Sequence, residues 1–326
     1  MKIFVTGGAG FIGSEFVRSA LSGKLEDLGI NPSKVIVYDA LTYAGNIDNL
    51  SSVEKDERLE IIKGDICDSN IERSIPKYCD LIVNFAAESH VDRSIEGPSV
   101  FVKTNILGTQ NLLEVAKKHE VKKFIQISTD EVYGSIENGS WDENFSLEPN
   151  SPYAASKACA DLLCLAYNKT YGLPILITRC SNNYGPYQNP EKLIPLFIKN
   201  LIEGSKLPLY GDGKNIREWI HVSDHVRAIS FAYKFGKDGE IYNIAGDNEK
   251  TNIEITRIIL REFGEDDSKV VYVKDRLGHD LRYALNGNKI RTLGFKNNVN
   301  FNDGIKDTIK WYVDNKEWIE NAVSKT

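Results

Sequence analysis

A glycine-rich turn between a predicted strand and a predicted helix is the feature of this sequence that most constrains its fold. Residues 2–6 are mostly apolar or β-branched and lead directly into Gly7-Gly8-Ala9-Gly10-Phe11-Ile12-Gly13, after which apolar residues recur at helical spacing. The glycines match the pattern G-x-G-x-x-G, whose bare backbone lets a pyrophosphate approach the helix N-terminus. The sequence therefore predicts a dinucleotide-binding unit in which Gly7, Gly10 and Gly13 contact the cofactor.

The next predicted strand ends in an acid that distinguishes between two cofactors. Residues 34–39 have the sequence Lys-Val-Ile-Val-Tyr-Asp, a strand pattern that closes on Asp39. A carboxylate at this place accepts hydrogen bonds from the ribose hydroxyls of adenosine and repels a 2′-phosphate. We therefore expect NAD rather than NADP.

The order of the other predicted elements indicates an α/β fold. Further strands are predicted at 59–63, 81–85 and 124–127, and long helices with apolar stripes at 100–118 and 153–171. This alternation is typical of a Rossmann-type, doubly wound parallel sheet, which binds ligands at the carboxyl ends of its strands. Two polar or small-residue segments, Gly64-Asp65-Ile66 and Ala86-Ala87-Glu88-Ser89-His90, directly follow such strands.

After Arg179 the pattern changes to shorter elements separated by prolines. It predicts helices at 193–203, 223–235 and 253–263, strands at 207–210, 241–244 and 270–273, and an amphipathic close over 304–319. We expect a Rossmann domain over residues 1–180 that also carries the catalytic residues. A smaller C-terminal α/β lobe is expected over 181–326, with the chain able to cross between the two.

A tyrosine and a lysine at the start of the helix 153–171 supply one acid–base function. Tyr153 and Lys157 are four residues apart, so a helix places them on one face. A phenol has a pKa of about 10, and a neighbouring ammonium favours its ionised form. The pair therefore predicts a general base that works near neutral pH.

Two adjacent carboxyl groups supply a second acid–base function. Asp130 and Glu131 closely follow the predicted strand 124–127. Because successive strand side chains point to opposite faces, the two carboxyls can share a substrate only if the strand has ended by Thr129. Two neighbouring carboxylates disfavour double ionisation, which helps one of them remain an acid.

Composition narrows the class of protein further. The net charge of −6 disfavours a nucleic-acid-binding face, which needs clustered Lys and Arg. A strand predicted from Lys2 and the lack of a long apolar run lead us to expect neither a signal peptide nor a membrane segment. The five cysteines form no C-x-x-C and indicate free thiols in a reducing compartment. We expect a cytoplasmic protein.

Read as a whole, the chain resembles the extended short-chain dehydrogenases/reductases and, within them, the dTDP-glucose 4,6-dehydratase family, whose product leads to rhamnose and other deoxysugars. The resemblance spans essentially the whole chain. The Asp130-Glu131 pair discriminates within the superfamily, because similar sugar-nucleotide epimerases carry small hydroxyl residues there. The most specific motifs are Thr129-Asp130-Glu131-Val132-Tyr133-Gly134, Ala87-Glu88-Ser89-His90-Val91-Asp92-Arg93-Ser94, Cys180-Ser181-Asn182-Asn183-Tyr184-Gly185-Pro186, Pro190-Glu191-Lys192-Leu193-Ile194-Pro195 and Asp275-Arg276-Leu277-Gly278-His279-Asp280.

The resemblance implies a hydro-lyase that converts dTDP-glucose to dTDP-4-keto-6-deoxyglucose. Tyr153 would take the C4 hydroxyl proton as NAD takes the C4 hydride, with Lys157 beside it and Thr129 on the C4 oxygen. Glu131 would remove the C5 proton, protonated Asp130 would donate to the departing C6 hydroxyl, and the hydride would return to C6.

The resemblance also assigns binding residues for the cofactor and for the sugar nucleotide, the latter mainly in the C-terminal lobe. Arg217 suits a diphosphate, since a guanidinium fork matches phosphate oxygens. The implied NAD contacts are Phe11, Ile12, Asp39, Thr42, Asp65, Ile66, Ala86, Ala87, Ser89, Thr104, Tyr153, Lys157 and Asn183. The implied substrate contacts are Ser89, His90, Thr129, Asn182, Lys192, Leu193, Pro208, Leu209, Tyr210, Arg217, Asn252, Asp275, Arg276 and His279.

Several alternatives stay open. The substrate base is thymine or uracil, so a UDP-glucose 4,6-dehydratase is the nearest alternative. A sugar-nucleotide 4-epimerase would share NAD and the Tyr-Lys pair without needing Asp130, and a non-catalytic NAD sensor would share only the fold. His221 and His225 are four apart, but no Glu follows His221 as in H-E-x-x-H, so we expect no metal. The apolar stripes of 100–118 and 153–171 predict a homodimer.

Overall fold

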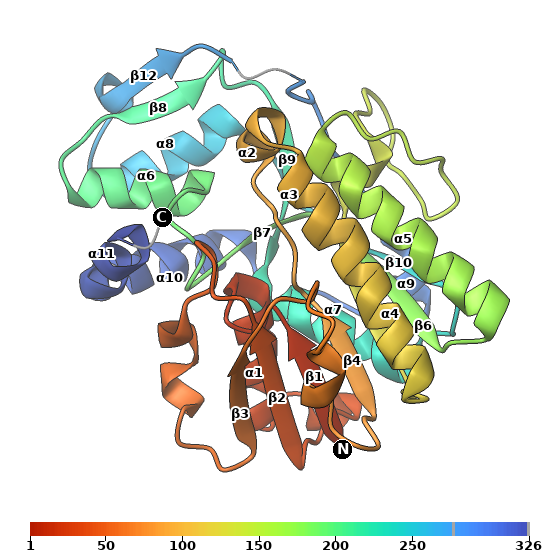
Figure 1. Cartoon of the computed structure of the whole chain (residues 1–326). Helices are drawn as coiled ribbons and strands as arrows, with labels where there is room; N and C mark the ends of the chain where they lie inside the picture. The colour runs from red at the N-terminus through yellow and green to blue at the C-terminus, as the bar shows by residue number, and fades with distance from the viewer. Residues whose placement is uncertain (276–277, 325–326) are drawn as a thin grey trace.

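A seven-stranded parallel sheet is the centre of the computed structural model, which describes residues 1–275 and 278–324 (Figure 1). The strand order is β10-β6-β5-β4-β1-β2-β3, so the chain reverses direction across the sheet between β1 and β4. Such a reversal places a crevice at the carboxyl ends of the strands, where ligands bind. The strands are β1 (Lys2–Thr6), β2 (Lys34–Asp39), β3 (Leu59–Lys63), β4 (Leu81–Asn84), β5 (Phe124–Thr129), β6 (Ile175–Cys180) and β10 (Ile241–Ile244).

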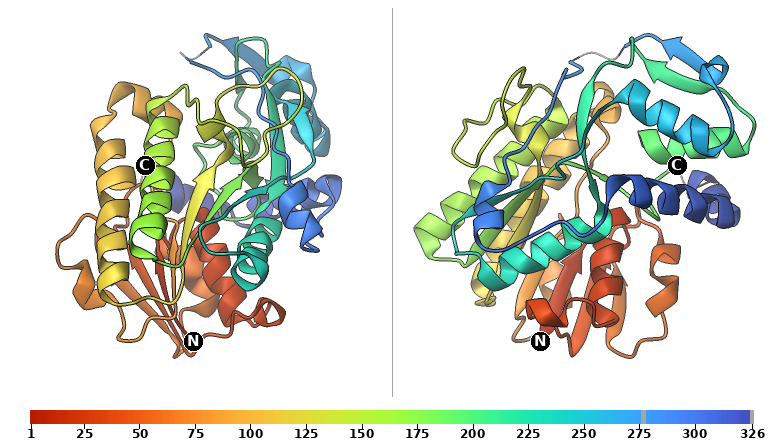
Figure 2. Two further views of the ribbon diagram at one scale, coloured as in Figure 1. Left: turned by 90° about the vertical axis from the view of Figure 1, so that its right-hand side faces the viewer. Right: turned by 180° about the vertical axis from the view of Figure 1, so that it is seen from behind.

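Helices cover both faces of this sheet and bury its apolar side chains. On one face α1 (Phe11–Leu21) packs against α7 (Val222–Phe235). On the other face α4 (Thr109–Lys118) and α5 (Pro152–Tyr171) run side by side (Figure 2). This two-sided cover confirms the doubly wound α/β fold expected from the sequence.

The second lobe packs around its own core; in Figure 1 its strands β8 and β12 lie at the top, and its helices α10 and α11 lie at mid-height on the left. It contains a three-stranded sheet in the order β11-β9-β7 and a two-stranded sheet of β12 and β8. Its strands are β7 (Asn182–Tyr184), β8 (Leu207–Tyr210), β9 (Ile216–His221), β11 (Glu249–Thr251) and β12 (Val270–Val273). Its helices are α6 (Leu193–Ile202), α8 (Asn252–Glu262), α10 (Phe301–Asp314) and α11 (Lys316–Ser324).

The chain crosses between the lobes after its midpoint. α7 lies on the large sheet, and β10 pairs in parallel with β6 at the sheet edge. The short helix α9 (Asn288–Thr292) also contacts β10. Residues 222–244 therefore belong with the first lobe in space, although they follow part of the second lobe in sequence.

Most predicted elements are present, and the differences have physical reasons. The segment 100–118 is helical but contains a π-helical stretch, since α3 (Ser99–Phe101) is followed by η4 (Val102–Gly108) and α4. The amphipathic close divides at Asn315 into α10 and α11. β6, β7 and β11 were not predicted, and no residue range was predicted for β9. β9 carries Arg217 and Glu218, which are both buried, so no polar–apolar alternation marks the strand. The short helix α2 (Val91–Glu96) was also not predicted.

Within residues 1–275 and 278–324 no helix combines the length and apolar character that crossing a membrane requires.

Candidate active site

One cavity runs along the carboxyl ends of the large sheet and continues under the second lobe. The β1–α1 turn, the ends of β2, β4 and β5, and the start of α5 line one side. β8, β9 and the segment before α6 line the other side. A ligand in this cavity would therefore touch both lobes.

The glycine turn forms the floor of the cavity at the N-terminus of α1. Gly7 has a φ of +65°, a conformation that side-chain-bearing residues rarely adopt. A Cβ on Gly13 would lie 2.3 Å from the carbonyl oxygen of Gly7, so only glycine lets the helix approach the turn this closely. Gly10, Phe11 and Ile12 line the cavity, where the first free N–H groups of α1 can meet an anion.

Asp39 holds the turn and also faces the cavity. Its carboxylate accepts backbone N–H groups from Ala9 at 2.9 Å and from Leu41 at 2.8 Å. Burial raises the pKa of this carboxyl, and the two hydrogen bonds oppose the shift. Each carboxylate oxygen can accept more than one hydrogen bond, so Asp39 can still accept ribose hydroxyls.

Every residue that the sequence assigned to the cofactor lies on this cavity. Besides the glycine turn and Asp39, the structure brings together residues from the loops after β2, β3 and β4 and from the helical segment 99–118. These residues are Thr42, Asp65, Ile66, Ala86, Ala87, Ser89 and Thr104, together with Asn183, Tyr153 and Lys157.

The strand before the two carboxyls runs two residues beyond the predicted 124–127 and still ends by Thr129, as a shared substrate requires. β5 stops at Thr129, and a 3₁₀ turn, η5 (Asp130–Tyr133), begins at the next residue. The Thr129 hydroxyl accepts the N–H of Glu131 at 3.3 Å and donates to Asp130 Oδ1 at 3.1 Å. Because the backbone leaves the strand here, both Asp130 and Glu131 line the cavity.

Asp130 and Glu131 have different surroundings. Asp130 is 2% exposed, and burial, followed by the charges of Glu131 and Glu218, raises its pKa well above the usual range. Its Oδ2 is buried and has no hydrogen-bond partner within the described chain. Glu131 is only partly buried. Burial therefore favours the neutral form of Asp130, beside a more accessible carboxyl.

Tyr153 and Lys157 both line the cavity from α5 and are buried. Burial raises the pKa of Tyr153 well above 10, with further contributions from Glu131, Cys180 and Asp130, while a hydrogen bond with Thr129 lowers it. The Lys157 ammonium donates to the carbonyl oxygen of Ile127 at 2.6 Å. Among the protein's own groups, burial thus opposes ionisation of the phenol, and the Thr129 hydrogen bond favours it.

The residues assigned to the substrate gather at the other end of the cavity, with two exceptions. Asp275 is not among the described residues that line it; its Oδ1 lies 2.6 Å from Nδ1 of His279, which does line it. Arg276 lies outside the described residues. The other predicted substrate residues all line the cavity: Ser89, His90, Thr129, Asn182, Lys192, Leu193, Pro208, Leu209, Tyr210, Arg217, Asn252 and His279.

Comparison with known proteins agrees with this geometry. The family model described as GDP-mannose 4,6 dehydratase matches residues 4–308. A dTDP-glucose 4,6-dehydratase from Streptomyces niveus is 52% identical over 321 residues, which are 98% of this chain and 95% of that protein. The chain belongs to the dTDP-glucose 4,6-dehydratase family.

Solved structures show the same relationship. The crystal structure of DesIV, a dTDP-glucose 4,6-dehydratase from Streptomyces venezuelae with NAD and TYD bound, superposes with a TM-score of 0.97 at 55% identity, covering 99% of this chain and 100% of that one. UDP-glucose 4-epimerase from Thermus thermophilus in complex with NAD has a TM-score of 0.87 at 29% identity, covering 97% and 100%. The wider superfamily thus shares the fold.

A charged cluster around Glu191 was only partly assigned from sequence, because His90 and Lys192 were expected to contact the substrate and Glu191 and Arg93 were given no role. The Glu191 carboxylate lies 3.4 Å from Arg93 Nη2 and 3.8 Å from His90 Nε2, and the Arg93 guanidinium lies 4.0 Å from the ring centre of Tyr43. Lys192 Nζ donates to the carbonyl oxygen of Ser89 at 3.0 Å. These contacts join the segment before α6 to the loop after β4. The sequence signal was the Pro190–Pro195 motif, without a role for Glu191.

Trp219 is a second cavity-lining residue that sequence reasoning missed. It lies on β9, and its indole Nε1 is buried without a hydrogen-bond partner in the described part of the chain. An unpaired buried donor beside a cavity is satisfied when a ligand or water supplies an acceptor. No residue range was predicted for β9, so the sequence did not place Trp219 at the cavity.

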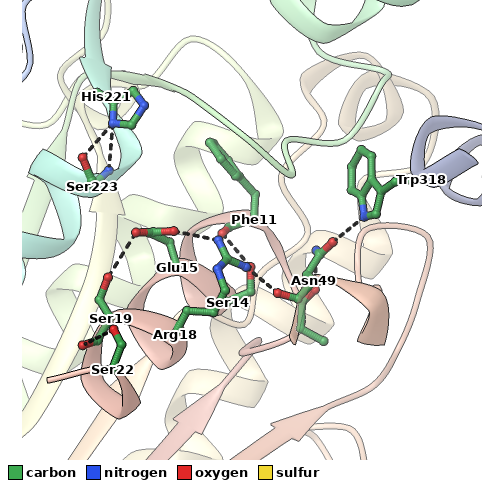
Figure 3. A network of polar contacts seen from close by, with 11 residues as sticks. Phe11, Ser14, Glu15, Arg18, Ser19, Ser22, Asn49, His221, Ser223 and Trp318 are labelled. Atoms are coloured by element: carbon green, nitrogen blue, oxygen red, sulfur yellow. Dashed lines mark hydrogen bonds and ion pairs between the residues drawn. The ribbon is translucent and has the colours of Figure 1, made fainter. Parts of the chain in front are cut away.

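The C-terminal helix α11 is tied to the glycine turn through Asn49. Figure 3 shows Trp318 pointing at Asn49, with Nε1 donating to Asn49 Oδ1 at 2.9 Å. The Asn49 amide donates in turn to the carbonyl oxygen of Ala9, in the glycine turn, at 2.9 Å. Arg18 of α1 also donates to the Asn49 carbonyl oxygen. The last helix of the chain therefore supports the first turn.

The two histidines four residues apart have separate roles. His221 caps α7, with Nδ1 2.7 Å from the Ser223 hydroxyl. His225 is fully buried, and its Nδ1 lies 2.9 Å from Oδ1 of Asn183. Among the residues that the structure describes, no three His, Cys, Asp or Glu side chains are grouped so as to hold a metal ion.

Proposed function

We propose that this protein catalyses the NAD-dependent 4,6-dehydration of a nucleoside-diphosphate glucose, converting dTDP-glucose to dTDP-4-keto-6-deoxyglucose. The observation that carries the proposal is the set of groups in one cavity. The glycine turn with Asp39, the Tyr153–Lys157 pair and the Asp130–Glu131 pair all line it. A dehydrogenase needs only the first two of these; the third adds the acid and base that an elimination requires.

NAD fits the first half of the cavity. The glycine turn leaves room for a pyrophosphate at the N-terminus of α1, and the Asp39 carboxylate suits two free ribose hydroxyls better than a 2′-phosphate. When bound, NAD supplies the acceptor of the C4 hydride, its later donor to C6, and a positive charge that favours ionised Tyr153.

The chain's own residues move the protons. Tyr153, as its phenolate, takes the proton of the C4 hydroxyl and becomes neutral, and the ammonium of Lys157 stabilises the phenolate before this transfer. The Thr129 hydroxyl, at the end of β5, orients the C4 oxygen. Glu131 takes the C5 proton, which the C4 ketone has made acidic. Asp130, whose pKa is raised by burial, gives its proton to the departing C6 hydroxyl.

The second half of the cavity suits a nucleoside diphosphate. Arg217 and Lys192 provide positive charge for the diphosphate, and Asn252, Tyr210 and His279 lie beside them on the second lobe. Trp219 adds an N–H donor inside this half. We assign the thymine nucleotide on the basis of the relatives' described activity, with uracil as the competing base.

A panel of nucleotide sugars tests the proposal. The purified protein is incubated with dTDP-glucose, UDP-glucose and GDP-mannose, and the products are weighed by mass spectrometry. We expect dTDP-glucose to lose one water with no net build-up of NADH, and Tyr153→Phe to lose this activity by about 10²–10⁴-fold. An unchanged mass with inversion at C4, seen by NMR, would instead make the protein an epimerase, and steady NADH accumulation would make it a simple dehydrogenase.

We also propose that the protein is a cytoplasmic homodimer. The helical segment 99–118 and α5 expose large apolar side chains, including Leu107 at 56% and Leu162 at 55%. Two such faces placed together would bury these side chains. All five cysteines are free, as expected of a protein in a reducing compartment.

A further inference from the structure

A buried ion pair lies behind the turn that carries Asp130 and Glu131. Asp161 is 0% exposed and Arg179 is 2% exposed, and Arg179 Nε donates to Asp161 Oδ2 at 2.9 Å. Neither is among the described residues that line the cavity. Removing two charges from water is costly, and such a pair is often no more stabilising than apolar residues of similar size. Its presence beside the active site therefore suggests a role in geometry.

The carboxylate of this pair holds the start of the turn. Ser128 Oγ donates to Asp161 Oδ2 at 3.0 Å. Ser128 is the residue before Thr129, and on β5 it lies directly opposite Arg179 of β6 in the sheet register. The last residues of β5 are therefore fixed to α5 as well as to β6.

The guanidinium of the pair holds the end of the turn. Arg179 Nη1 donates to the Tyr133 hydroxyl at 2.8 Å, and Tyr133 is the last residue of η5. The Tyr133 hydroxyl donates onward to Asn243 Oδ1 on β10 at 2.9 Å. The Tyr133 ring stacks on Trp141 at 5.5 Å between ring centres. Asp130 and Glu131 thus lie between two anchored ends.

The same carboxylate also faces the other catalytic pair. Tyr153, Lys157 and Asp161 follow one another at intervals of four on α5, so they lie along one face of the helix. Burial lowers the pKa of Lys157, and the charge of Asp161, followed by those of Cys180 and Cys164, opposes this shift. Asp161 therefore connects the helix bearing Tyr153 and Lys157 to the turn bearing the acid and base.

We propose that Asp161 and Arg179, acting through Ser128 and the Tyr133 hydroxyl, are positioning residues that set the η5 turn against α5. This inference rests on the proposed function, because it concerns how the elimination groups meet a sugar that Tyr153 has already engaged. A misplacement of about 1 Å costs on the order of 10²-fold in rate. Loosening the far end of the turn, at Tyr133, therefore slows the steps of Asp130 and Glu131 and spares the step of Tyr153, because Thr129 is still paired with Cys180 in the sheet.

Tyr133→Phe is the test variant, because it removes only the hydroxyl and keeps the ring against Trp141. Three rates are measured: C4 oxidation in a single turnover, exchange of the C5 hydrogen with deuterated solvent, and release of water. We expect C4 oxidation and KM within about threefold of wild type, and the two later rates lowered by about 10- to 100-fold.

Tyr242→Phe is the matched control. Tyr242 is a buried tyrosine of β10 whose hydroxyl also has a hydrogen bond, from the backbone N–H of Lys237 at 3.0 Å. Both variants lose one bonded hydroxyl from the interior, so general destabilisation affects both. We expect Tyr242→Phe to leave the ratio of the three rates unchanged, whatever its thermal midpoint.

Arg179→Lys adds a second, independent measurement. A lysine keeps the charge opposite Asp161, but its single ammonium lacks the fork that reaches both Asp161 and Tyr133. It should show the same selective loss as Tyr133→Phe, and the double variant should be little slower than either single variant. An equal slowing of all three rates, or multiplied losses in the double variant, would overturn the proposal. If wild type releases no water, the proposed function fails instead.

Discussion

At the scale of single residues, neighbouring carboxyls differ because one is enclosed and the other is not. Asp130 is the first residue of η5, and its pKa is raised by burial and by the nearby acids Glu131 and Glu218. Glu131, one residue later, is only partly buried. The Thr129 hydroxyl accepts the backbone N–H of Glu131 and donates to the side-chain carboxylate of Asp130. The two side chains are thus suited to an acid and a base respectively.

Leaving-group chemistry separates these two roles. Asp130→Asn should spare C4 oxidation and slow elimination from dTDP-glucose by about 10²–10⁴-fold, because the C6 hydroxyl leaves without a proton. A substrate with fluoride at C6 needs no such proton, so it should recover much of that loss. The measurement is the elimination rate of each variant on both substrates.

Glu131→Gln provides the comparison. It removes the base for the C5 proton, and a better leaving group should not restore the rate fully. Equal rescue of both variants by fluoride, or no rescue of Asp130→Asn, would contradict the assignment of acid and base.

At the scale of elements, α5 contributes one face to the active site and exposes another face on the molecular surface. Its inner face carries Tyr153, Lys157 and Asp161, all buried, and its outer face exposes Leu162. The parallel segment 99–118 exposes Leu107 beside it, and both helices are drawn at the left of the first view in Figure 2. Leu162 follows Asp161 directly on α5, so one helix carries both the ion pair and the surface that we assign to a dimer.

Charge placed on this surface should prevent association. We expect Leu107→Glu and Leu162→Glu to convert a dimer into a monomer at micromolar concentration, because two buried carboxylates would face one another without partners. Light scattering gives the mass directly. Val313→Glu is the control, since Val313 is 38% exposed on α10, away from these helices. A wild-type monomer, or a dimer in both helix variants, would refute the proposed interface.

At the scale of the whole molecule, the crossing of the chain between lobes places a buried histidine under the cofactor site. His225 lies on α7, and its partner Asn183 lies on β7 and lines the cavity. Burial lowers the pKa of His225 to about 3 from 6.5. Between those values the unfolded chain binds a proton that the folded protein does not, so the free energy of unfolding falls as the pH falls.

His225→Asn should reduce this pH dependence. From about pH 7 to about pH 5 the wild-type protein should lose about 2 kcal/mol of unfolding free energy that the variant keeps. Asparagine retains a polar group near Nδ1, so the contact with Asn183 can persist. The pKa of Glu218 is raised to about 7 and changes stability in the opposite direction, but it does so in both proteins. Denaturant unfolding at both pH values measures the difference, and equal losses would contradict the assignment.

Local sequence was sufficient wherever the function of a residue depends on its neighbours in the chain. Gly7, Gly10 and Gly13 form their turn through backbone conformation within seven residues, and Tyr153 and Lys157 share a face because a helix repeats every 3.6 residues. The condition that the strand end by Thr129 if Asp130 and Glu131 share a substrate also came from the sequence, and β5 meets this condition. These patterns are short-range, so the sequence by itself determined the fold class and most residues of the candidate site.

Tertiary structure decided the features that depend on residues distant in the chain. The ion pair of Asp161 and Arg179 with Tyr133, the bond from Trp318 to Asn49 and the cluster around Glu191 each join separate elements. Arg217 and Glu218 are buried on β9. Their charges alone would predict exposed side chains, and only the tertiary structure shows the partners that allow burial. The pKa values of Tyr153 and Asp130 follow burial, which no local pattern records, because desolvation is set by everything that surrounds a group in space.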